Sequence, residues 1–237
     1  MQEHRLQVGE TTMEVDITGA WVTSLRDADG DILFARAPLK NDEGDTKLRG
    51  GCHVCVPQFG PSGDELDLAQ HGFGRDSLWT VQDSTPSTLV LSLAPTHEDY
   101  QDLQIILTYK LAQSSLIMEL SLHNDRTSEV RVAPAFHPYF ATNRAATIGL
   151  NDETLSVDDF GDTKFIEGMR NVLEVNGRTV ELVCDELPLW ALWSDRLGEY
   201  FCVEPTLGGN LFLNQQAGEK ELIAPNGHAS YRFAIFW

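Results

Sequence analysis

Residues 103–122, LQIILTYKLAQSSLIMELSL, decide the fold of this chain of 237 residues. Apolar side chains recur at every second position on both sides of a short polar break at residues 113–115. A period of two is typical of β-strands that bury one face. Two long alternating runs joined so tightly predict adjacent antiparallel strands. The positions that define the period are Leu103, Ile105, Leu107, Tyr109 and Leu111, then Leu116, Met118, Leu120 and Leu122.

Shorter strand-like segments surround this pair. Asp29 and Gly30 lie between the apolar runs 20–25 and 32–34, which is the pattern of a β-hairpin. The acidic stretch 151–176 shows few recognisable elements, and we find no amphipathic helix of ordinary length. The sequence therefore predicts an all-β fold, a large antiparallel β-sandwich or barrel, as one domain over residues 1–237. Further strands are expected at 78–81, 88–93, 129–134, 178–183, 189–193, 200–204, 210–213 and 231–237.

The charge balance excludes some classes of partner. Thirty-six acidic residues against seventeen basic ones give a net charge of −19, which repels nucleic acid and anionic membranes. No stretch approaches the roughly 20 apolar residues that span a bilayer, and the N-terminus lacks the pattern of a signal peptide. Four cysteines are too few for a disulfide framework, which agrees with a reducing compartment. We expect a cytoplasmic protein that binds neither nucleic acid nor membranes.

The cysteines offer one metal hypothesis. Cys52 and Cys55 have the C-x2-C spacing of a zinc site, but a partner pair is missing. Cys184 and Cys202 are far apart and flanked by strand-like residues, so we interpret all four as buried thiols that behave as small hydrophobic side chains. Two glycine pairs, Gly50-Gly51 and Gly208-Gly209, could suggest phosphate-binding loops, but neither precedes a helix pattern with the spacing of a nucleotide-binding loop. No G-x-S-x-G motif is present. The sequence thus predicts no metal and no organic cofactor.

A long segment rich in Gly and Pro, residues 49–79, has the composition of a binding loop. It contains His71 between two arginines. Later in the chain, His137 stands in AFHPYF and Glu204 in CVEP. A lone histidine is more often structural than catalytic, but a carboxylate after an apolar run is costly to bury without a partner. A histidine and a carboxylate in one pocket form an acid/base pair near neutral pH, the chemistry that opens and closes a hemiacetal.

The order of these motifs resembles that of the aldose 1-epimerase family, most of all its hexose-6-phosphate mutarotase branch, the glucose-6-phosphate 1-epimerases. The early stretch 19–34, GAWVTSLRDADGDILF, also resembles the N-terminal hairpin of that family. The motifs that carry the resemblance are RGG at 49–51, PQFGP at 57–61, HGFGR at 71–75 followed by LW, AFHPYF at 135–140 and CVEP at 202–205.

The resemblance implies a galactose mutarotase-like β-sandwich that binds a sugar or sugar phosphate on a concave face. It implies that His137 is the general acid that protonates the ring oxygen. Glu204 would be the general base that removes the proton from the C1 hydroxyl. The ring opens to the aldehyde, rotates about the C1–C2 bond and closes to the other anomer, without a metal or organic cofactor.

The resemblance also implies a set of substrate-binding residues. His71 would hold hydroxyls or the ring oxygen, and Arg49 and Arg75 would bind sugar hydroxyls or a 6-phosphate. Gln58 and Phe59 would shape the wall of the site. The family also uses an aspartate between the catalytic histidine and glutamate. The candidates here are Asp159, Asp162 and Asp185, none of which stands in a motif that aligns.

Two function classes follow from this sequence. The first is an enzyme that interconverts the α and β anomers of an aldohexose or a hexose 6-phosphate. The second is a non-catalytic carbohydrate-binding or regulatory protein on the same fold, because a fold does not determine a function. The presence of both members of the acid/base pair favours the enzyme. The sequence does not indicate the oligomeric state.

Overall fold

The alternating stretch forms the two long central strands of the computed structural model, which describes residues 3–63, 66–214 and 216–237. Strands β10 (Leu103–Ala112) and β11 (Ser115–Asn124) pair antiparallel, with Tyr109 opposite Met118. Every position that defined the period of two is buried. The expected antiparallel pair is confirmed.

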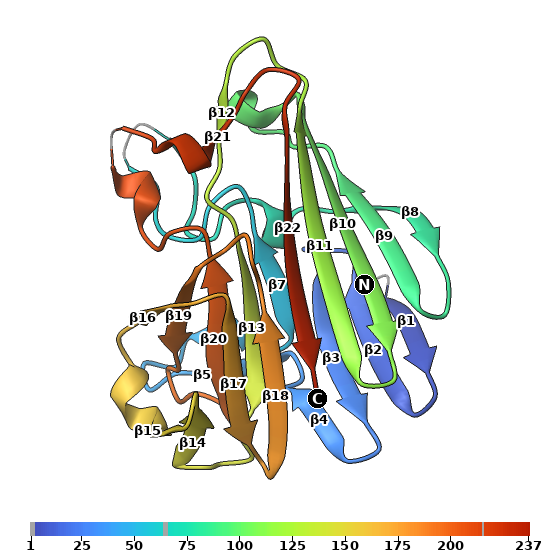
Figure 1. The fold of residues 1–237 in the computed structure, drawn as a ribbon, viewed down its shortest axis with the longest axis vertical. Helices are drawn as coiled ribbons and strands as arrows, with labels where there is room; N and C mark the ends of the chain where they lie inside the picture. The colour runs from blue at the N-terminus through green and yellow to red at the C-terminus, as the bar shows by residue number, and fades with distance from the viewer. Residues whose placement is uncertain (1–2, 64–65, 215) are drawn as a thin grey trace.

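These two strands lie in a nine-stranded antiparallel sheet (Figure 1). On the side away from β10, β11 pairs with β22, the last strand of the chain. The middle and the end of the sequence therefore lie side by side in this sheet. The order is β15 (Glu153–Ser156), β14 (Thr147–Leu150), β17 (Arg170–Val175), β18 (Arg178–Val183), β22 (His228–Phe236), β11, β10, β9 (Thr88–Leu93) and β8 (Thr80–Ser84).

A second nine-stranded sheet faces the first. Strand β7 (Cys52–Cys55) belongs to it and pairs with both β13 and β3. The expected hairpin around Asp29 and Gly30 is confirmed as β3 and β4. The remaining order is β1 (Glu3–Val8), β2 (Thr11–Asp16), β3 (Trp21–Asp27), β4 (Gly30–Leu33), β13 (Ala135–Ala141), β20 (Tyr200–Thr206), β19 (Leu189–Trp193) and β16 (Lys164–Glu167).

The hydrophobic core lies between the two sheets. The ring of Phe136 in β13 lies 5.5 Å from that of Phe233 in β22, and Trp190 in β19 reaches the same ring at 6.0 Å. All three side chains are fully buried. The fold is thus the predicted all-β antiparallel sandwich, in which each sheet buries one face against the other.

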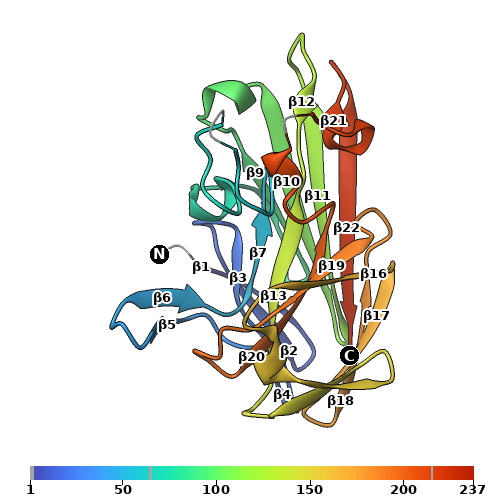
Figure 2. The ribbon, with the colours of Figure 1, turned by 90° about the vertical axis from the view of Figure 1, so that its left-hand side faces the viewer.

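Two small sheets lie outside the sandwich. Strands β5 (Ala37–Lys40) and β6 (Thr46–Arg49) form a sheet of their own among the described residues, and their hairpin projects from the body of the molecule (Figure 2). Strands β12 (Val130–Arg131) and β21 (Leu222–Ile223) form the other small sheet. In the part of the chain that the structure describes, the remaining elements are five short 3-10 helices: Gly74–Asp76, Glu98–Tyr100, Val157–Phe160, Leu211–Leu213 and Glu219–Glu221. Within the described ranges, no helix is long and apolar enough to cross a membrane.

Three sequence-based expectations differ from the structure. Residues 129–134 do not add a strand beside β11, because β22 occupies that place and only Val130–Arg131 pairs, with β21. Residues 210–213 contain the 3-10 helix Leu211–Leu213 in place of a strand. The stretch 151–176 holds β15, β16 and β17, although its sequence indicated few elements.

Candidate active site

Alternation along β13 and β20 places two sets of side chains on opposite faces of their sheet. Phe136 and Phe140 of β13 point into the core, so His137 and Tyr139 point to the face away from the other sheet. On β20, Val203 lies in the core by the same alternation. This outer face of the sheet forms the floor of the site.

The pairing register then aligns the functional side chains in one row. Ala135 pairs with Thr206 and Tyr139 with Cys202, so His137 and Glu204, midway between these pairs, lie directly opposite each other. Side chains opposite each other in antiparallel strands stand about 5 Å apart on the same face. The ladder, more than any loop, therefore fixes the geometry of the two groups.

His137 and Glu204 form a buried pair. Nε2 of His137 lies 3.3 Å from Oε2 of Glu204, and the residues are 4% and 1% exposed. Burial lowers the pKa of His137 well below its ordinary value, and the neighbouring His53 and His71 lower it further. Burial raises the pKa of Glu204 well above its ordinary value. Both shifts disfavour charge, so the pair is suited to passing a proton between neutral partners.

The pair lies at the floor of a cavity of about 750 Å³, a size typical of small-molecule sites. Of the residues that the sequence indicated for binding, Arg49, Phe59, His71 and Arg75 line the cavity together with His137 and Glu204. The other residues that line it are Lys47, Pro61, Gln70, Tyr139, Thr163, Phe165, Trp193 and Asn210.

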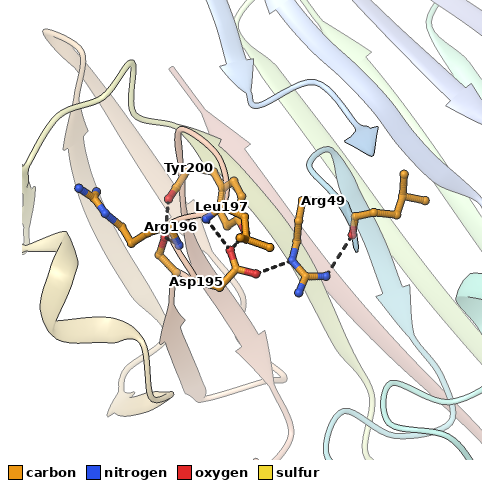
Figure 3. Close-up of polar contacts among 7 residues, drawn as sticks. Arg49, Asp195, Arg196, Leu197 and Tyr200 are labelled. Atoms are coloured by element: carbon orange, nitrogen blue, oxygen red, sulfur yellow. Dashed lines mark hydrogen bonds and ion pairs between the residues drawn. The ribbon is translucent and has the colours of Figure 1, made fainter. Parts of the chain in front are cut away.

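Arg49, at the end of β6, is held by a polar network (Figure 3). Its Nε donates to Oδ2 of Asp195 at 2.8 Å, and its guanidinium lies 5.3 Å from the ring of Trp193. Asp195 also accepts from the hydroxyl of Tyr200 and from the backbone N–H of Leu197. Burial opposes the charge of Arg49, but the hydrogen bond to Asp195 and the electrostatic contributions of Asp195 and two nearby tyrosines together outweigh it, and the pKa of Arg49 rises. The guanidinium is thus a fixed cation at the cavity wall.

His71 and Arg75 come from the loop between β7 and β8. His71 has a φ of +71° and Gly72 a φ of +68°, and the backbone N–H of His71 donates to the carbonyl of Phe59. A left-handed histidine stores strain, which the surrounding contacts must hold. Burial, together with the smaller effect of the charge of Arg75, lowers the pKa of His71 to about 4. His71 is therefore neutral at pH 7 and presents one donor and one acceptor.

Gln58 is not one of the cavity-lining residues. Its side chain is fully buried and its Nε2 donates to the carbonyl of Ala69 at 2.9 Å. That bond ties the segment before His71 to the segment after β7. The structure therefore places Gln58 behind the wall of the cavity and Phe59 on it, and substrate contact by Gln58 stays a prediction.

The structure also bears on metal binding. All four cysteines are free and buried, as the sequence indicated. Within the described part of the chain, the only cluster of three donor groups close enough to hold an ion is His137, Cys202 and Glu204, whose donor atoms lie within 4.8 Å of one another. Burial raises the pKa of Cys202 well above its ordinary value, and the nearby Glu204 raises it further. A metal ion would have to displace this thiol proton to use Cys202 as a ligand.

Comparison with known proteins identifies the family. The family model described as aldose 1-epimerase matches residues 3–181. The chain belongs to the aldose 1-epimerase family. The matched range includes Arg49, His71, Arg75 and His137. Asp195 and Glu204 lie after it.

Two curated relatives of this chain carry the name "Putative glucose-6-phosphate 1-epimerase". The one from Cenchrus ciliaris is 32% identical over 95 residues, which are 36% of this chain and 28% of the relative. The one from Escherichia coli strain K12 is 28% identical over 150 residues, 60% of this chain and 45% of the relative. The matched segments thus span less than half the length of either relative.

Solved structures share the galactose mutarotase-like fold over 99% of this chain. A galactose mutarotase-like protein from Lactobacillus casei covers 99% of this chain and 99% of its own, with a TM-score of 0.83 at 15% identity. A protein from Synechocystis sp. PCC 6803 covers 99% and 95%, with a TM-score of 0.79 at 21% identity. At these identities the likeness concerns the fold alone.

Several residues of this candidate site were not indicated by the sequence. Tyr139 stacks on His137, with ring centroids 4.6 Å apart and planes 12° apart, and alternation along AFHPYF was a signal for it. Lys47 and Trp193 also line the cavity, but no motif marked them. Asp195, which anchors Arg49, was not among the aspartates considered. Those three, Asp159, Asp162 and Asp185, are exposed and do not line the cavity.

Proposed function

We propose that the protein is a mutarotase, an aldose 1-epimerase that interconverts the α and β anomers of an aldohexose or its 6-phosphate. One observation carries the proposal: a buried histidine and a buried carboxyl group, 3.3 Å apart, form the floor of a cavity large enough for a hexose. Membership of the aldose 1-epimerase family supports the same reaction.

In the proposed reaction the pair acts on both sides of the anomeric carbon. The pair holds one transferable proton, and its move from Glu204 to Nε2 of His137 leaves an imidazolium and a carboxylate. The imidazolium then gives a proton to the ring oxygen while the carboxylate takes the proton of the C1 hydroxyl, which returns both groups to their neutral forms. The bond between C1 and the ring oxygen breaks, and its electron pair goes to that oxygen. The hydroxyl oxygen becomes the carbonyl of the open-chain aldehyde. Rotation about the C1–C2 bond presents the other face of the carbonyl, and reversal of the two proton transfers closes the other anomer.

The surrounding residues have distinct roles in this proposal. His71, neutral at pH 7, donates to or accepts from sugar hydroxyls. Tyr139 and Trp193 offer ring faces and edges to the apolar C–H groups of the sugar. The face of Tyr139 also fixes the plane of the His137 ring by stacking. Binding in this cavity removes water from the acid/base pair.

A 6-phosphate is the substrate group that the charges of the cavity favour. Lys47, Arg49 and Arg75 all line it, in a protein whose net charge is −19. Arginine side chains bind phosphate oxygens with two parallel N–H donors, and lysine adds a point charge. The names of the two curated relatives, glucose-6-phosphate 1-epimerases, point the same way. We therefore propose hexose 6-phosphates as the preferred substrates.

The test of the reaction is a mutarotation assay on freshly dissolved α-anomers of glucose, galactose and glucose 6-phosphate. We expect wild-type protein to accelerate the approach to equilibrium of at least one. His137→Asn and Glu204→Gln should lower kcat by about 100-fold or more. His123→Asn is the matched control, because His123 pairs with a partly exposed Asp125 at 3.0 Å, belongs to the other large sheet and does not line the cavity. Unchanged rates for all three sugars with wild-type protein would refute the proposal. Thermal stabilisation by sugar without turnover would instead indicate the carbohydrate-binding alternative.

The test of the substrate group compares glucose 6-phosphate with glucose. We expect a higher kcat/KM for the phosphate and a selective loss in Arg75→Gln. Removing one charged hydrogen bond should lower kcat/KM for the phosphate roughly 10- to 100-fold and for glucose much less. Equal losses for both sugars would assign Arg75 to the hydroxyls.

A further inference from the structure

A third histidine lies directly behind the acid/base pair. His53, in the middle of β7, pairs in register with His137 on the side of β13 opposite β20. Alternation along β7 puts Cys52 and Val54 in the core, so His53 points to the same face as His137. The row across the ladder is therefore His53, His137 and Glu204, with the catalytic imidazole in the middle.

His53 cannot touch the substrate directly, because it is 0% exposed and is not one of the residues that line the cavity. Aromatic rings enclose it. Its ring centroid lies 4.4 Å from that of Trp21, 4.8 Å from that of His137 and 5.8 Å from that of His71. An imidazole so deeply buried costs free energy unless its nitrogens find partners, and a phenylalanine would occupy the same space without that cost.

The contacts of the ring determine which nitrogen carries the proton. Nδ1 of His53 lies 3.4 Å from the carbonyl oxygen of Val54 and 3.9 Å from Sγ of Cys55. A carbonyl only accepts and is a stronger hydrogen-bond partner than a thiol, so we assign the hydrogen of the ring to Nδ1. Burial lowers the pKa of His53 well below its ordinary value, and the nearby His71 and Arg75 lower it further, so the ring is neutral. Nε2 of His53 is consequently an acceptor, and it has no hydrogen-bond partner among the residues that the structure describes.

His137 presents the complementary group. Its Nε2 faces Glu204, and its Nδ1 is buried without a hydrogen-bond partner in the described residues. A histidine that gives and takes a proton at Nε2 keeps its Nδ1 protonated throughout. That Nδ1–H needs an acceptor, and the need is greatest when the ring becomes an imidazolium. The neighbouring ring of His53 carries a buried acceptor that lacks a donor.

We propose that His53 is a positioning residue for the catalytic imidazole: its neutral ring accepts from Nδ1–H of His137, directly after a small ring rotation or through one bound water. The link keeps Nε2 of His137 directed at Glu204 and stabilises the transient imidazolium. The proposal rests on the proposed mutarotase function. It assigns to β7 a part in proton transfer, in addition to its place in the sheet.

The kinetic test replaces the ring of His53 by one of similar size without nitrogen. His53→Phe should lower kcat for the best sugar roughly 10- to 100-fold, the effect of losing one hydrogen bond to a charged group. KM should stay within about twofold, because His53 does not line the cavity. His53→Gln restores an acceptor at a similar reach and should recover a large part of kcat. A kcat of His53→Phe within about twofold of wild type would overturn the proposal, and so would equal losses in His53→Phe and His53→Gln.

A matched control separates positioning from packing. His4 in β1 is also a strand histidine whose buried Nε2 lacks a hydrogen-bond partner among the described residues, but it does not line the cavity. His4→Phe should leave kcat unchanged. Thermal unfolding of each variant shows whether a lost rate follows lost stability. If His53→Phe lowers kcat only in proportion to its folded fraction, the role of His53 is packing.

A spectroscopic measurement tests the link without any turnover. Long-range ¹H–¹⁵N correlation spectra of the imidazole rings distinguish nitrogens that carry a proton from those that do not. In wild-type protein we expect the Nδ1–H form for both His53 and His137, and in His53→Gln the same form for His137. An Nε2–H form of His53 in wild type would refute the proposal. Absence of mutarotation with these forms intact would contradict only the proposed function.

Discussion

At the scale of single residues, the site concentrates groups whose burial opposes folding. Glu204 is 1% exposed with its pKa raised, and His137 is 4% exposed with its pKa lowered. Each shift means that the charged form of the group is less stable in the folded protein than in the unfolded chain. Such groups persist where a reaction needs them, at a cost in stability.

Replacing the buried carboxyl group should therefore separate activity from stability. Because the folded-state pKa of Glu204 is raised, the folded protein binds a proton that the unfolded chain releases above about pH 4.5. Wild-type stability falls as pH rises through this window, and Glu204→Gln escapes that loss. We expect Glu204→Gln to melt roughly 2–4 °C above wild type at pH 7.5, with a smaller difference at pH 5. A lower Tm for Glu204→Gln at pH 7.5, measured by calorimetry, would show that the carboxylate is stabilised by its surroundings.

The anchoring of Arg49 gives a second prediction at this scale. Asp195→Asn removes the charge that holds the guanidinium, so Arg49 should sample more orientations and KM for glucose 6-phosphate should rise about tenfold. Asp27→Asn is the control, since Asp27 holds Arg178 by two hydrogen bonds at a site outside the cavity. Steady-state kinetics on both variants measure the effect. Equal KM values for Asp195→Asn and wild type would mean that Trp193 alone orients Arg49.

Residues that stand in motifs were predictable, and residues that act through distant pairing were not. His137, Glu204, Arg49, His71 and Arg75 were all named from local sequence, and the structure brings them to one cavity. Asp195 and Trp193 reach Arg49 only because β19 and the loop after it lie beside the end of β6. No local pattern encodes that proximity. The catalytic and binding roles themselves stay predictions until the kinetic tests are done.

At the scale of elements, the loop that delivers His71 depends on one close backbone approach. Gly72 has a φ of +68°, and a Cβ there would lie 2.2 Å from the carbonyl oxygen of Val56. A side chain therefore meets both backbone strain and a collision with rigid backbone. The backbone of the loop thus packs directly against the backbone of Val56, the residue that follows β7.

Two alanine substitutions distinguish the cost of a positive φ from the cost of a steric clash with the backbone. Gly177 has a similar φ of +71°, but nothing lies within 4 Å of its Cβ position. Gly177→Ala should cost about 1 kcal/mol, the strain alone. Gly72→Ala should cost clearly more and also raise KM, because His71 must shift with its neighbour. Urea unfolding and steady-state kinetics provide both measurements, and equal free energies of unfolding for the two variants would show that the loop yields without cost.

Elements with a clean period were predictable, whereas short or mixed ones were not. The run 103–122 alternates over its whole length and forms β10 and β11 as expected. In β17 the period is hidden, because one of its buried positions is Asn171, which accepts a hydrogen bond from Asn151. The three apolar residues Leu211–Leu213 are too few to distinguish a strand from a helical turn, and they form a 3-10 helix. The sequence also cannot reveal that the last strand lies beside β11.

At the scale of the whole molecule, charge is the dominant feature. A net charge of −19 on 237 residues destabilises the compact state through self-repulsion, which unfolding relieves. The cavity carries a local excess of basic side chains in a protein that is acidic as a whole. Three of the seventeen basic residues, Lys47, Arg49 and Arg75, line that cavity, so it is a local attractor for an anion.

The self-repulsion predicts that salt stabilises the protein. Raising NaCl from 20 mM to 500 mM shortens the screening length from roughly 20 Å to about 4 Å, so Tm at pH 7.5 should rise by several degrees. A parallel series near pH 4.5, where many carboxylates take up protons, should show a much smaller rise. Calorimetric melts at both values of pH measure the difference. An equal salt effect at the two values would assign it to salting-out of apolar surface.

The projecting hairpin of β5 and β6 has a consequence for protein engineering. Its strands form a sheet of their own among the described residues, yet it carries Lys47 and Arg49 to the cavity. The length and charge of residues 40–48 should therefore be exchangeable without a change in the pairing of β13 with β20, provided that Leu39, which packs against the cluster of Tyr139, Tyr200 and Cys202, is kept. Libraries restricted to this hairpin should alter which sugars are accepted and leave the proton-transfer geometry as inherited.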